Sequence, residues 1–309
     1  MSDTTVDQLL PGATEVAFSE IEPTLARLTR DSGGHKRLPG RALTATVVVV
    51  GPSARLIEAA QALEGLGERA GVRAILIAEG TLTSPPVRVT EHTIAILGLA
   101  PQYVDNAVAA LRLSSLPAAV WWRGGSPEAL TELADLADRM VLDTDNPDEV
   151  WSTAESLFEQ TAVTDLRWTR LTRWRSLLAS LFDVPQVREA IPRLKQLTIT
   201  ARDIPCARLV AGWLVSALGP AGWEVHISPG TDDGQLLLES IQLSSGDQTI
   251  AVRARRTCME ASIEKPRSCT RVVPLTDVKL ATWIGEELAV RARDLAFEAA
   301  LRAARQLPV

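Results

Sequence analysis

The sequence is poor in the residues that bind metals, and this shortage excludes several kinds of site. It contains three cysteines and three histidines in 309 residues. No two cysteines have the C-x-x-C spacing, and no H-E-x-x-H or H-x-H motif occurs. The sequence therefore gives no support to a structural zinc site or to a metalloprotease centre, and we expect no metal.

Long hydrophobic runs are also missing. The longest candidate, residues 45–51, has the length of a strand, whereas a membrane-spanning helix needs about 18 apolar residues. The first ten residues, MSDTTVDQLL, have neither the basic region nor the apolar region of a secretory signal. We therefore expect a cytoplasmic protein that does not enter a membrane.

Lysine is scarce, with four residues against 28 arginines. The net charge of −6 argues against a nucleic-acid binder that works through bulk positive charge. We attribute most of the arginine excess to a genome rich in G and C. The alternative is a functional role, because the planar guanidinium of arginine suits carboxylates, phosphates and protein interfaces.

The glycine pattern of a dinucleotide site is absent. The first strand-to-helix turn, VVVVGPSAR, contains one glycine, whereas the G-x-G-x-x-G fingerprint needs several so that a pyrophosphate can approach a helix N-terminus. Gly65 and Gly67 have the closest spacing, but they lie where a helix ends. No phosphate-binding G-x-x-x-x-G-K-[ST] loop occurs either. We expect no NAD, FAD or other cofactor.

What the sequence does have is a regular alternation of strand and helix patterns over residues 41–163, after an N-terminal segment of residues 1–40. The run TATVVVV at residues 44–50 is typical of a strand buried on both faces. Alternation with short links predicts a Rossmann-like α/β domain with a mostly parallel sheet. Strand patterns occur at 73–79, 87–100, 118–122 and 139–144, and helix patterns at 53–64, 103–113, 127–137 and 147–160.

From residue 164 the pattern changes, which predicts a second domain over residues 164–309. A helix is expected from Asp165, as its N-cap, to Asp183, and a long helix from Asp277 to the end. Between them successive strand patterns with glycine, aspartate or proline turns predict an α+β domain with an antiparallel meander. These strands are expected at 194–200, 223–228, 235–245, 248–262 and 268–277, with turns at Asp233-Gly234, Gly246-Asp247 and Pro266.

No catalytic constellation is found. GGSPE resembles the G-x-S-x-G nucleophile turn, but Glu128 stands where the second glycine is required, so Ser126 is better explained as a helix N-cap before Pro127. Asp143 and Asp145 follow a strand and could hold a metal or act as a base, although the Asp-Asn-Pro that follows is ordinary loop chemistry. We therefore predict that the chain is not an enzyme.

The segment LPAAVWWRGGSPEAL places two tryptophans before an arginine and two glycines. Trp121 and Trp122 must point to opposite faces of their strand, since successive residues alternate. Arg123 follows the carboxyl end of that strand, where ligands bind in open α/β sheets. Arg123, Gly125 and Ser126 are thus a candidate anion site at a helix N-terminus. The alternative is two core tryptophans and a helix start with nothing bound.

Large aromatic side chains and arginines are also the usual anchors of protein interfaces. The sequence has eight tryptophans, one tyrosine and four phenylalanines. In the helix predicted from Asp165, tryptophans lie on the apolar stripe and arginines on the other faces; the alternative is a core helix with solvated arginines. The candidate interface residues are Trp121, Trp122, Arg123, Trp168, Arg170, Trp174 and Arg175.

Cys258 and Cys269 flank SIEKPR, an expected hairpin connection, at nearly symmetric positions. They could face each other across the two strands, which makes them candidate redox thiols. A disulfide needs Cα atoms within about 7 Å. In a reducing cytoplasm two free thiols are the favoured alternative.

The segments LPAAVWWRG and DLRWTRLTRWRSLLASLFD resemble the glucose-6-phosphate dehydrogenase assembly protein family, OpcA, and so does SGGHKRLPGRALTATVVVV. The resemblance spans residues 20 to 300 or so. It implies two domains and a non-catalytic partner that promotes assembly or activation of glucose-6-phosphate dehydrogenase, the first enzyme of the oxidative pentose phosphate pathway. In cyanobacteria the family is tied to redox control through cysteines, which adds thioredoxin as a partner to consider, but those cysteines are not mapped onto Cys258 and Cys269.

A second hypothesis comes from the residues and not from the resemblance. It is a sugar-phosphate or nucleotide-binding enzyme or sensor that holds phosphate at the turn from Arg123 to Ser126. Thermal stabilisation by a phosphorylated metabolite alone would favour it over the protein effector.

Overall fold

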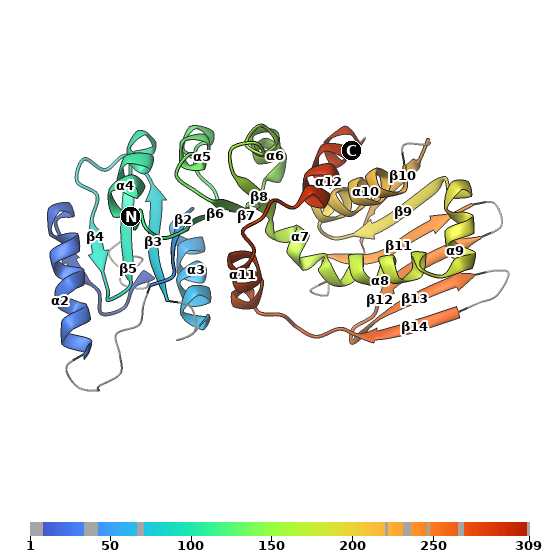
Figure 1. Ribbon diagram of the computed structural model, residues 1–309, viewed down its shortest axis with the longest axis horizontal. Coiled ribbons are helices and arrows are strands. Elements are labelled where there is room, and N and C mark those ends of the chain that lie inside the picture. The colour runs from blue at the N-terminus through green and yellow to red at the C-terminus, as the bar shows by residue number, and fades with distance from the viewer. Residues whose placement is uncertain are drawn as a thin grey trace. The chain divides into compact units, whose positions relative to one another are not determined.

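The structure is a computed structural model of the chain, and it describes residues 9–33, 43–66, 71–219, 222–230, 236–245, 248–264 and 269–307. The chain forms two compact units (Figure 1). The first unit comprises Met1–Leu166 and Lys279–Arg293, and the second comprises Arg167–Val278 and Asp294–Val309.

The first unit is built on an eight-stranded sheet of order β1-β4-β5-β3-β2-β6-β7-β8. Strand β4 pairs antiparallel with β1 and β5, and every other neighbouring pair is parallel. The mostly parallel Rossmann-like sheet predicted from the sequence is thus confirmed. The strands are β1 (Thr14–Val16), β2 (Ala45–Val50), β3 (Val72–Glu79), β4 (Val87–Val89), β5 (Thr93–Leu99), β6 (Ala118–Trp122), β7 (Arg139–Leu142) and β8 (Ala162–Asp165).

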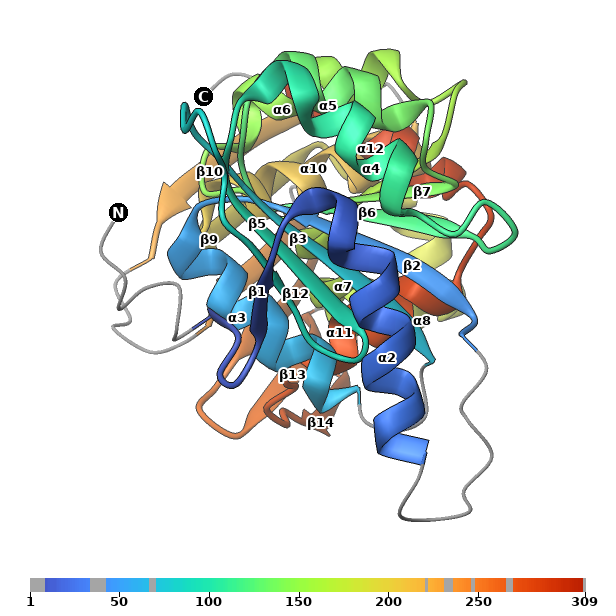
Figure 2. The same cartoon turned by 90° about the vertical axis from the view of Figure 1, so that its left-hand side faces the viewer.

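Helices cover both faces of this sheet, with α3 and α11 on one side and α4, α5 and α6 on the other (Figure 2). Coverage of both faces explains the continuous valine run of β2, in which Val47 to Val50 are fully buried. The helices are α2 (Ile21–Gly33), α3 (Ser53–Gly65), α4 (Val104–Leu111), α5 (Pro127–Ala134), α6 (Pro147–Ser156) and α11 (Leu280–Ala289), with 3-10 turns at Phe18–Glu20 and Pro101–Tyr103.

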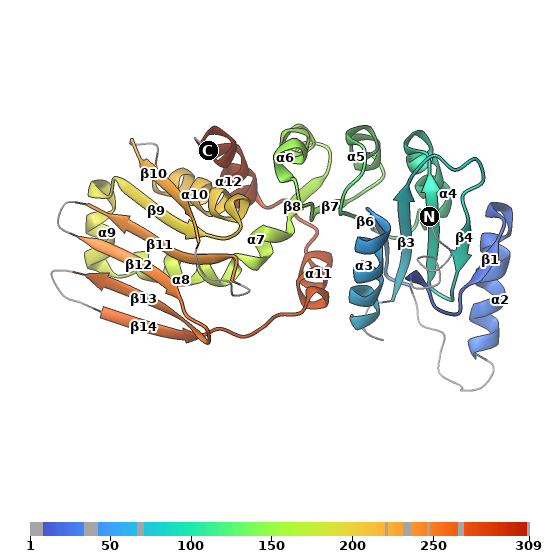
Figure 3. The same ribbon diagram turned by 180° about the vertical axis from the view of Figure 1, so that it is seen from behind.

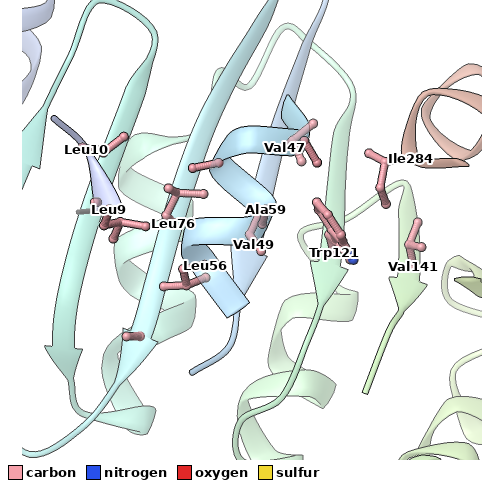
Figure 4. Close-up of a cluster of buried hydrophobic side chains, with 14 of the residues drawn as sticks. Leu9, Leu10, Val47, Val49, Leu56, Ala59, Leu76, Trp121, Val141 and Ile284 are labelled. Atoms are coloured by element: carbon pink, nitrogen blue, oxygen red, sulfur yellow. The ribbon is translucent and has the colours of Figure 1, made fainter. Parts of the chain in front are cut away.

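The core beneath α3 and α11 contains Trp121 (Figure 4). Its indole packs with Val49, Val141 and Ile284 in one hydrophobic cluster. Trp122, the next residue of β6, points to the opposite face of the sheet, because strand residues alternate. Both tryptophans are 1% exposed. Each therefore fills the core on its own side of the sheet.

The second unit has a six-stranded mixed sheet of order β10-β9-β11-β12-β13-β14. Strands β11 to β14 form the expected antiparallel meander, whereas β9 and β10 are parallel because helix α10 carries the chain between them. The strands are β9 (Gln196–Ala201), β10 (Glu224–Pro229), β11 (Leu238–Ser244), β12 (Thr249–Ala254), β13 (Cys258–Glu264) and β14 (Cys269–Pro274). The helices are α7 (Leu166–Arg170), α8 (Thr172–Phe182), α9 (Pro185–Ala190), α10 (Ile204–Leu218) and α12 (Leu295–Gln306), with a 3-10 turn at Ile191–Arg193.

Three expectations about element boundaries were wrong. The helix expected from Asp165 is two helices, α7 and α8, and Asp165 ends strand β8, where its Oδ2 accepts a 2.9 Å hydrogen bond from Trp151 Nε1. The strand expected over 248–262 is two strands of the meander, β12 and β13.

The long C-terminal helix is also two helices, because the chain is extended at Val290 and Asp294 caps α12. The first of these, α11, packs in the first unit, and α12 packs in the second. The turns expected at Asp233-Gly234, Gly246-Asp247 and Pro266 lie outside the described residues.

Candidate functional site

The carboxyl ends of β2 and β6 lie side by side. From this point the chain connections run toward opposite edges of the parallel sheet. From β2 the chain continues through α3 to β3 on one side, and β6 and β7 lie on the other. In open α/β sheets this edge is where ligands bind. Val50 and Trp122 are register partners there, so the residues that follow them, Gly51 and Arg123, stand at the centre of the edge.

Arg123 fills this position with its own side chain, which is 2% exposed. Its backbone N donates a 2.7 Å hydrogen bond to Val50 O. A Cβ on Gly51 would lie 2.9 Å from Arg123 Cβ, closer than real contacts allow. The single glycine of the first strand-to-helix turn therefore makes room for Arg123, not for a pyrophosphate.

The guanidinium of Arg123 is held by three groups of the protein. Nη1 donates to the Arg55 carbonyl at 2.6 Å, and Nη2 donates to Glu58 Oε2 at 2.6 Å. Nε lies 2.9 Å from Asp143 Oδ2 in an ion pair that is almost fully buried. Two of these partners come from the start of α3 and one from the end of β7, so the arginine ties α3 to the neighbouring strand.

Asp143 lies between two arginines. Besides Arg123, it has Arg55 Nη2 at 3.8 Å, and it accepts a 3.3 Å hydrogen bond from Trp121 Nε1. Arg55 also pairs with the exposed Asp145 at 3.0 Å. Asp143 and Asp145, the candidate metal or base residues of the sequence, are thus engaged in ion pairs with arginines.

Glu79, the last residue of β3, occupies the N-terminus of α5. Its Oε2 accepts a 2.9 Å hydrogen bond from Ser126 N, and its Oε1 accepts a 3.3 Å bond from Ser126 Oγ. Ser126 Oγ also accepts from Ala129 N at 3.3 Å, which confirms its predicted role as N-cap. Burial raises the pKa of the Glu79 carboxyl; the two bonds from Ser126 oppose this shift and nearby Glu128 adds to it.

The double glycine provides the space for this arrangement. Gly124 and Gly125 have φ values of 139° and 146°, in the region that favours glycine. A Cβ on Gly125 would lie 2.8 Å from both Glu79 Oε1 and Trp122 Cη2. The segment WWRGG is therefore explained by packing: one indole on each side of the sheet, a buried arginine, and a bend that closes on the second indole and on Glu79.

The structure corrects the candidate anion site of Arg123, Gly125 and Ser126. Ser126 N, which an external anion would use, is bonded to Glu79, and Arg123 is bonded to Glu58 and Asp143. The sequence showed the donors but not the carboxylates that strand order brings to them.

The structure also corrects most of the candidate interface. Trp121 and Trp122 are 1% exposed, Trp168 2%, Arg123 3% and Trp174 7%, so these five residues form no surface. Arg170 and Arg175 are half-buried.

Trp168 shows why the tryptophan-arginine segment of α7 and α8 is internal. Its Nε1 donates a 2.7 Å hydrogen bond to Asp294 Oδ2, and its ring centroid lies 5.9 Å from that of Phe297. The guanidinium of Arg175 stacks 3.6 Å above its ring. The segment therefore joins α7 to the start of α12.

The expected facing of Cys258 and Cys269 was wrong. Across β13 and β14, Cys258 is the register partner of Pro274, and Cys269 is the partner of Ile263. The two cysteines are five positions apart along the ladder, about 16 Å at the usual rise. This separation excludes a disulfide between them in the folded chain, and Cys258 is a free, half-buried thiol.

Glu58, Arg55 and Glu79 were missed in the sequence. Each is an ordinary charged residue whose role depends on strand order, although the position of Glu79 at the end of a predicted strand was a usable signal. Within the described ranges, no group of three His, Cys, Asp or Glu side chains could hold a metal ion. No described helix is both long enough and apolar enough to span a membrane.

Comparison with known proteins identifies relatives for part of the chain. Residues 161–301 match the family described as the C-terminal domain of a glucose-6-phosphate dehydrogenase subunit. The OpcA protein of Synechococcus elongatus is 32% identical over 153 residues, covering 47% of this chain and 34% of the relative. That of Synechocystis sp. is 30% identical over 142 residues, covering 40% and 30%. The matched segments thus span about a third of the length of these relatives.

Solved structures give distant likenesses of the fold alone. UDP-N-acetylglucosamine 3-dehydrogenase GnnA from Acidithiobacillus ferrooxidans is 10% identical, with a TM-score of 0.47, over 86% of this chain and 97% of that one. A super-repressor mutant of Gal80p from Saccharomyces cerevisiae is 9% identical, with a TM-score of 0.48, over 79% and 83%. Residues 161–301 thus match that domain family, and part of the chain is similar to OpcA proteins, as the sequence motifs indicated.

Proposed function

We propose that the chain is a non-catalytic protein that binds glucose-6-phosphate dehydrogenase and promotes its assembly or activation. The observation that carries the proposal is the match of residues 161–301 to a domain described as part of a glucose-6-phosphate dehydrogenase subunit. The OpcA relatives, named for the OxPP cycle, support it. The same proposal places the chain in the oxidative pentose phosphate pathway and in the cytoplasm. It includes no nucleic-acid partner.

The carboxyl edge of the parallel sheet, where Arg123 and Ser126 bind the chain's own carboxylates, supports a role without catalysis. A nucleotide or sugar phosphate at this edge would lie close to the carboxylates of Glu58, Glu79 and Asp143, which already bind Arg123 and Ser126 N. These like charges would repel the phosphate. The alternative of a phosphate-binding enzyme or sensor would require Glu79 to leave Ser126, and nothing in the described structure favours this.

A partner protein can promote assembly by mass action alone. If the chain binds the active oligomer of the dehydrogenase more tightly than the inactive form, it raises the population of that oligomer by its difference in affinity. No catalytic group on the chain is needed. The chain's surface is then the functional part, and the buried tryptophans act by holding each unit in shape.

The experiment is a titration of the purified dehydrogenase of the same organism with the full chain. The particle mass is followed by light scattering, with and without reductant. We expect a heavier species at a fixed stoichiometry. A mixture whose masses are those of the two separate proteins at about tenfold excess of the chain would contradict the proposal.

The half-buried arginines Arg170 and Arg175 remain the candidate interface residues at the surface of α7 and α8. Arg170→Ala should weaken binding to the dehydrogenase without unfolding the chain. A matched control is Arg188→Ala, on α9, whose side chain is 68% exposed. Equal affinity of the two variants would remove Arg170 from the interface.

A further inference from the structure

Strand β14 is an edge of the second unit's sheet and pairs with β13 alone. Figure 3 shows it as the lowest strand of that sheet, with no described strand or helix beneath it. An edge strand presents N–H and C=O groups on its outer side, and a further strand can pair with them. The backbone of β14 is therefore a place where another polypeptide can add to the sheet.

One hydrogen bond fixes which residues of β14 face outward. Leu275 N donates to Thr257 O at 2.8 Å, which makes these two residues a hydrogen-bonded pair at the end of the β13–β14 ladder. Such pairs alternate with unbonded pairs along an antiparallel ladder. The backbone of Val273 is therefore directed to β13, and the backbones of Thr270 and Val272 are directed outward.

The outer side of β14 offers two donors and three acceptors. The N–H groups of Thr270 and Val272 donate to no described residue. Pro274, the next outward position, has a carbonyl but no N–H. The three outward carbonyls are those of Thr270, Val272 and Pro274.

The side chains of this strand also suit a neighbour. Val272 is 60% exposed, and it is the one large hydrophobic side chain that the described strands leave exposed. Thr270 is exposed as well. Both are β-branched residues, which are favourable where they pack against a strand on either side. A strand added at this edge would bury the valine.

We propose that β14 pairs with β14 of a second copy of this chain, antiparallel about a two-fold axis through Val272. A two-fold axis brings identical residues together, and two antiparallel copies of one strand meet this condition. Val272 N–H then donates to the Val272 carbonyl of the other copy, and Thr270 N–H donates to the Pro274 carbonyl. Each outward donor finds an acceptor, and the two six-stranded sheets become one.

The charge and the proline of β14 are compatible with this register. Arg271 lies opposite Val273 of the other copy, whereas an axis through Arg271 would place two like charges directly opposite each other, which is destabilising. Pro274 stands at the end of the new ladder, where only its carbonyl is used. Charged residues and prolines usually protect an edge from pairing, but here neither blocks it.

The new ladder is short, so the interface is small and the dimer is weak. We expect a dissociation constant on the order of tens of micromolar. Sedimentation of the full chain at about 1 to 200 μM should show the mass rising from 33.3 kDa toward twice that value.

The test variant is Val272→Pro, which removes an outward N–H and leaves every hydrogen bond to β13 in place. Proline is tolerated in an edge strand at such a position. The dissociation constant should rise about a hundredfold, because two of the four new hydrogen bonds are lost and the proline ring stands in the interface. Val272→Thr is the matched control: it keeps the N–H and the branched shape, so the constant should change by less than about tenfold.

A second variant does not depend on how well Val272→Pro folds. In Val272→Cys the two new thiols face each other in a hydrogen-bonded pair, where Cα atoms lie about 5.5 Å apart, within the range of a disulfide. Mild oxidation should link two copies into a species of twice the mass on a gel without reductant. Arg188→Cys, at a position 68% exposed on α9, is the control and should not link above the level of the wild type.

A wild type that is monomeric at about 200 μM would overturn the proposal, and so would a Val272→Pro variant as dimeric as Val272→Thr. Linking of Val272→Cys no greater than that of the control would exclude the proposed register. A monomeric wild type whose binding to the dehydrogenase is lost in Val272→Pro would also overturn the proposal and assign the edge to the dehydrogenase. The proposal does not depend on the proposed function, since the chain is tested alone.

Discussion

Ser126, at the start of α5, donates two hydrogen bonds to the carboxylate of Glu79. The backbone N of Ser126 donates at 2.9 Å and its hydroxyl donates at 3.3 Å. A negative charge at a helix N-terminus is favourable, and here the chain supplies that charge from its own strand β3. The ligand-binding edge of the fold is therefore occupied by the protein.

Glu79 should make stability depend on pH. Burial raises its folded-state pKa above the usual 4.5. The folded protein then holds this proton more tightly than the unfolded chain does, so the stabilisation is fully present below pH 4.5 and is lost as pH rises through the folded-state pKa. In Glu79→Gln the stabilisation is absent. Urea unfolding at a series of pH values should show the wild type losing stability relative to the variant as pH rises from 4.5. A constant difference would contradict the assigned pKa direction.

Arg123→Ala should destabilise the chain by about 3 kcal/mol, because it leaves Asp143 buried with less positive charge. Asp143 is 5% exposed, and Arg123 Nε lies 2.9 Å from its Oδ2. The control is Arg188→Ala: that arginine is 68% exposed and 3.9 Å from Asp183, so its removal should change stability by less than about 0.5 kcal/mol. Unfolding in urea measures both, and equal effects would show that the buried network does not stabilise the fold.

Gly125→Ala should cost more than Gly12→Ala. Both glycines have positive φ, 146° and 74°, so both variants carry backbone strain of about 1–3 kcal/mol. At Gly12 a Cβ meets nothing within 4 Å, whereas at Gly125 it lies 2.8 Å from Glu79 Oε1 and from Trp122. We expect the difference in unfolding free energy to be about 2 kcal/mol. If the two variants were equally stable, the bend would not be packed on Trp122.

No disulfide should form between Cys258 and Cys269 in the folded protein, since their strands place them five register positions apart. After mild oxidation and digestion, mass spectrometry should find no peptide that joins them. The buried Cys206 should resist alkylation until the chain unfolds, whereas the half-buried Cys258 reacts earlier. A disulfide-linked peptide that contains both Cys258 and Cys269, found while the protein is still fully folded, would contradict the observed register.

Local patterns predicted much of the fold. The valine run of β2 and the alternation that follows it indicated a parallel sheet, and Ser126 with Pro127 indicated the start of α5. The C-terminal helix could not be predicted as two pieces, because α11 packs against residues more than 100 positions earlier in the chain, such as Trp121 and Val141. Only that packing separates it from α12.

The site was predicted less well, for a related reason. Arg123 and Ser126 were recognised as groups that attract anions, and they do bind anions. The anions are Glu58, Glu79 and Asp143, which strand order brings together from three separate segments. The tryptophans were candidates for surface anchors, with burial in the core as the alternative, because composition does not distinguish an interface from a core. Their burial is a property of the folded sheet and helices.

The most direct measurement is dehydrogenase activity as the full chain is titrated in, beside the chain alone with glucose 6-phosphate and a nicotinamide cofactor. The account predicts a saturable rise in dehydrogenase activity and no turnover by the chain alone. Turnover by the chain alone that Asp143→Asn abolishes, with no effect of the chain on the dehydrogenase, would contradict it.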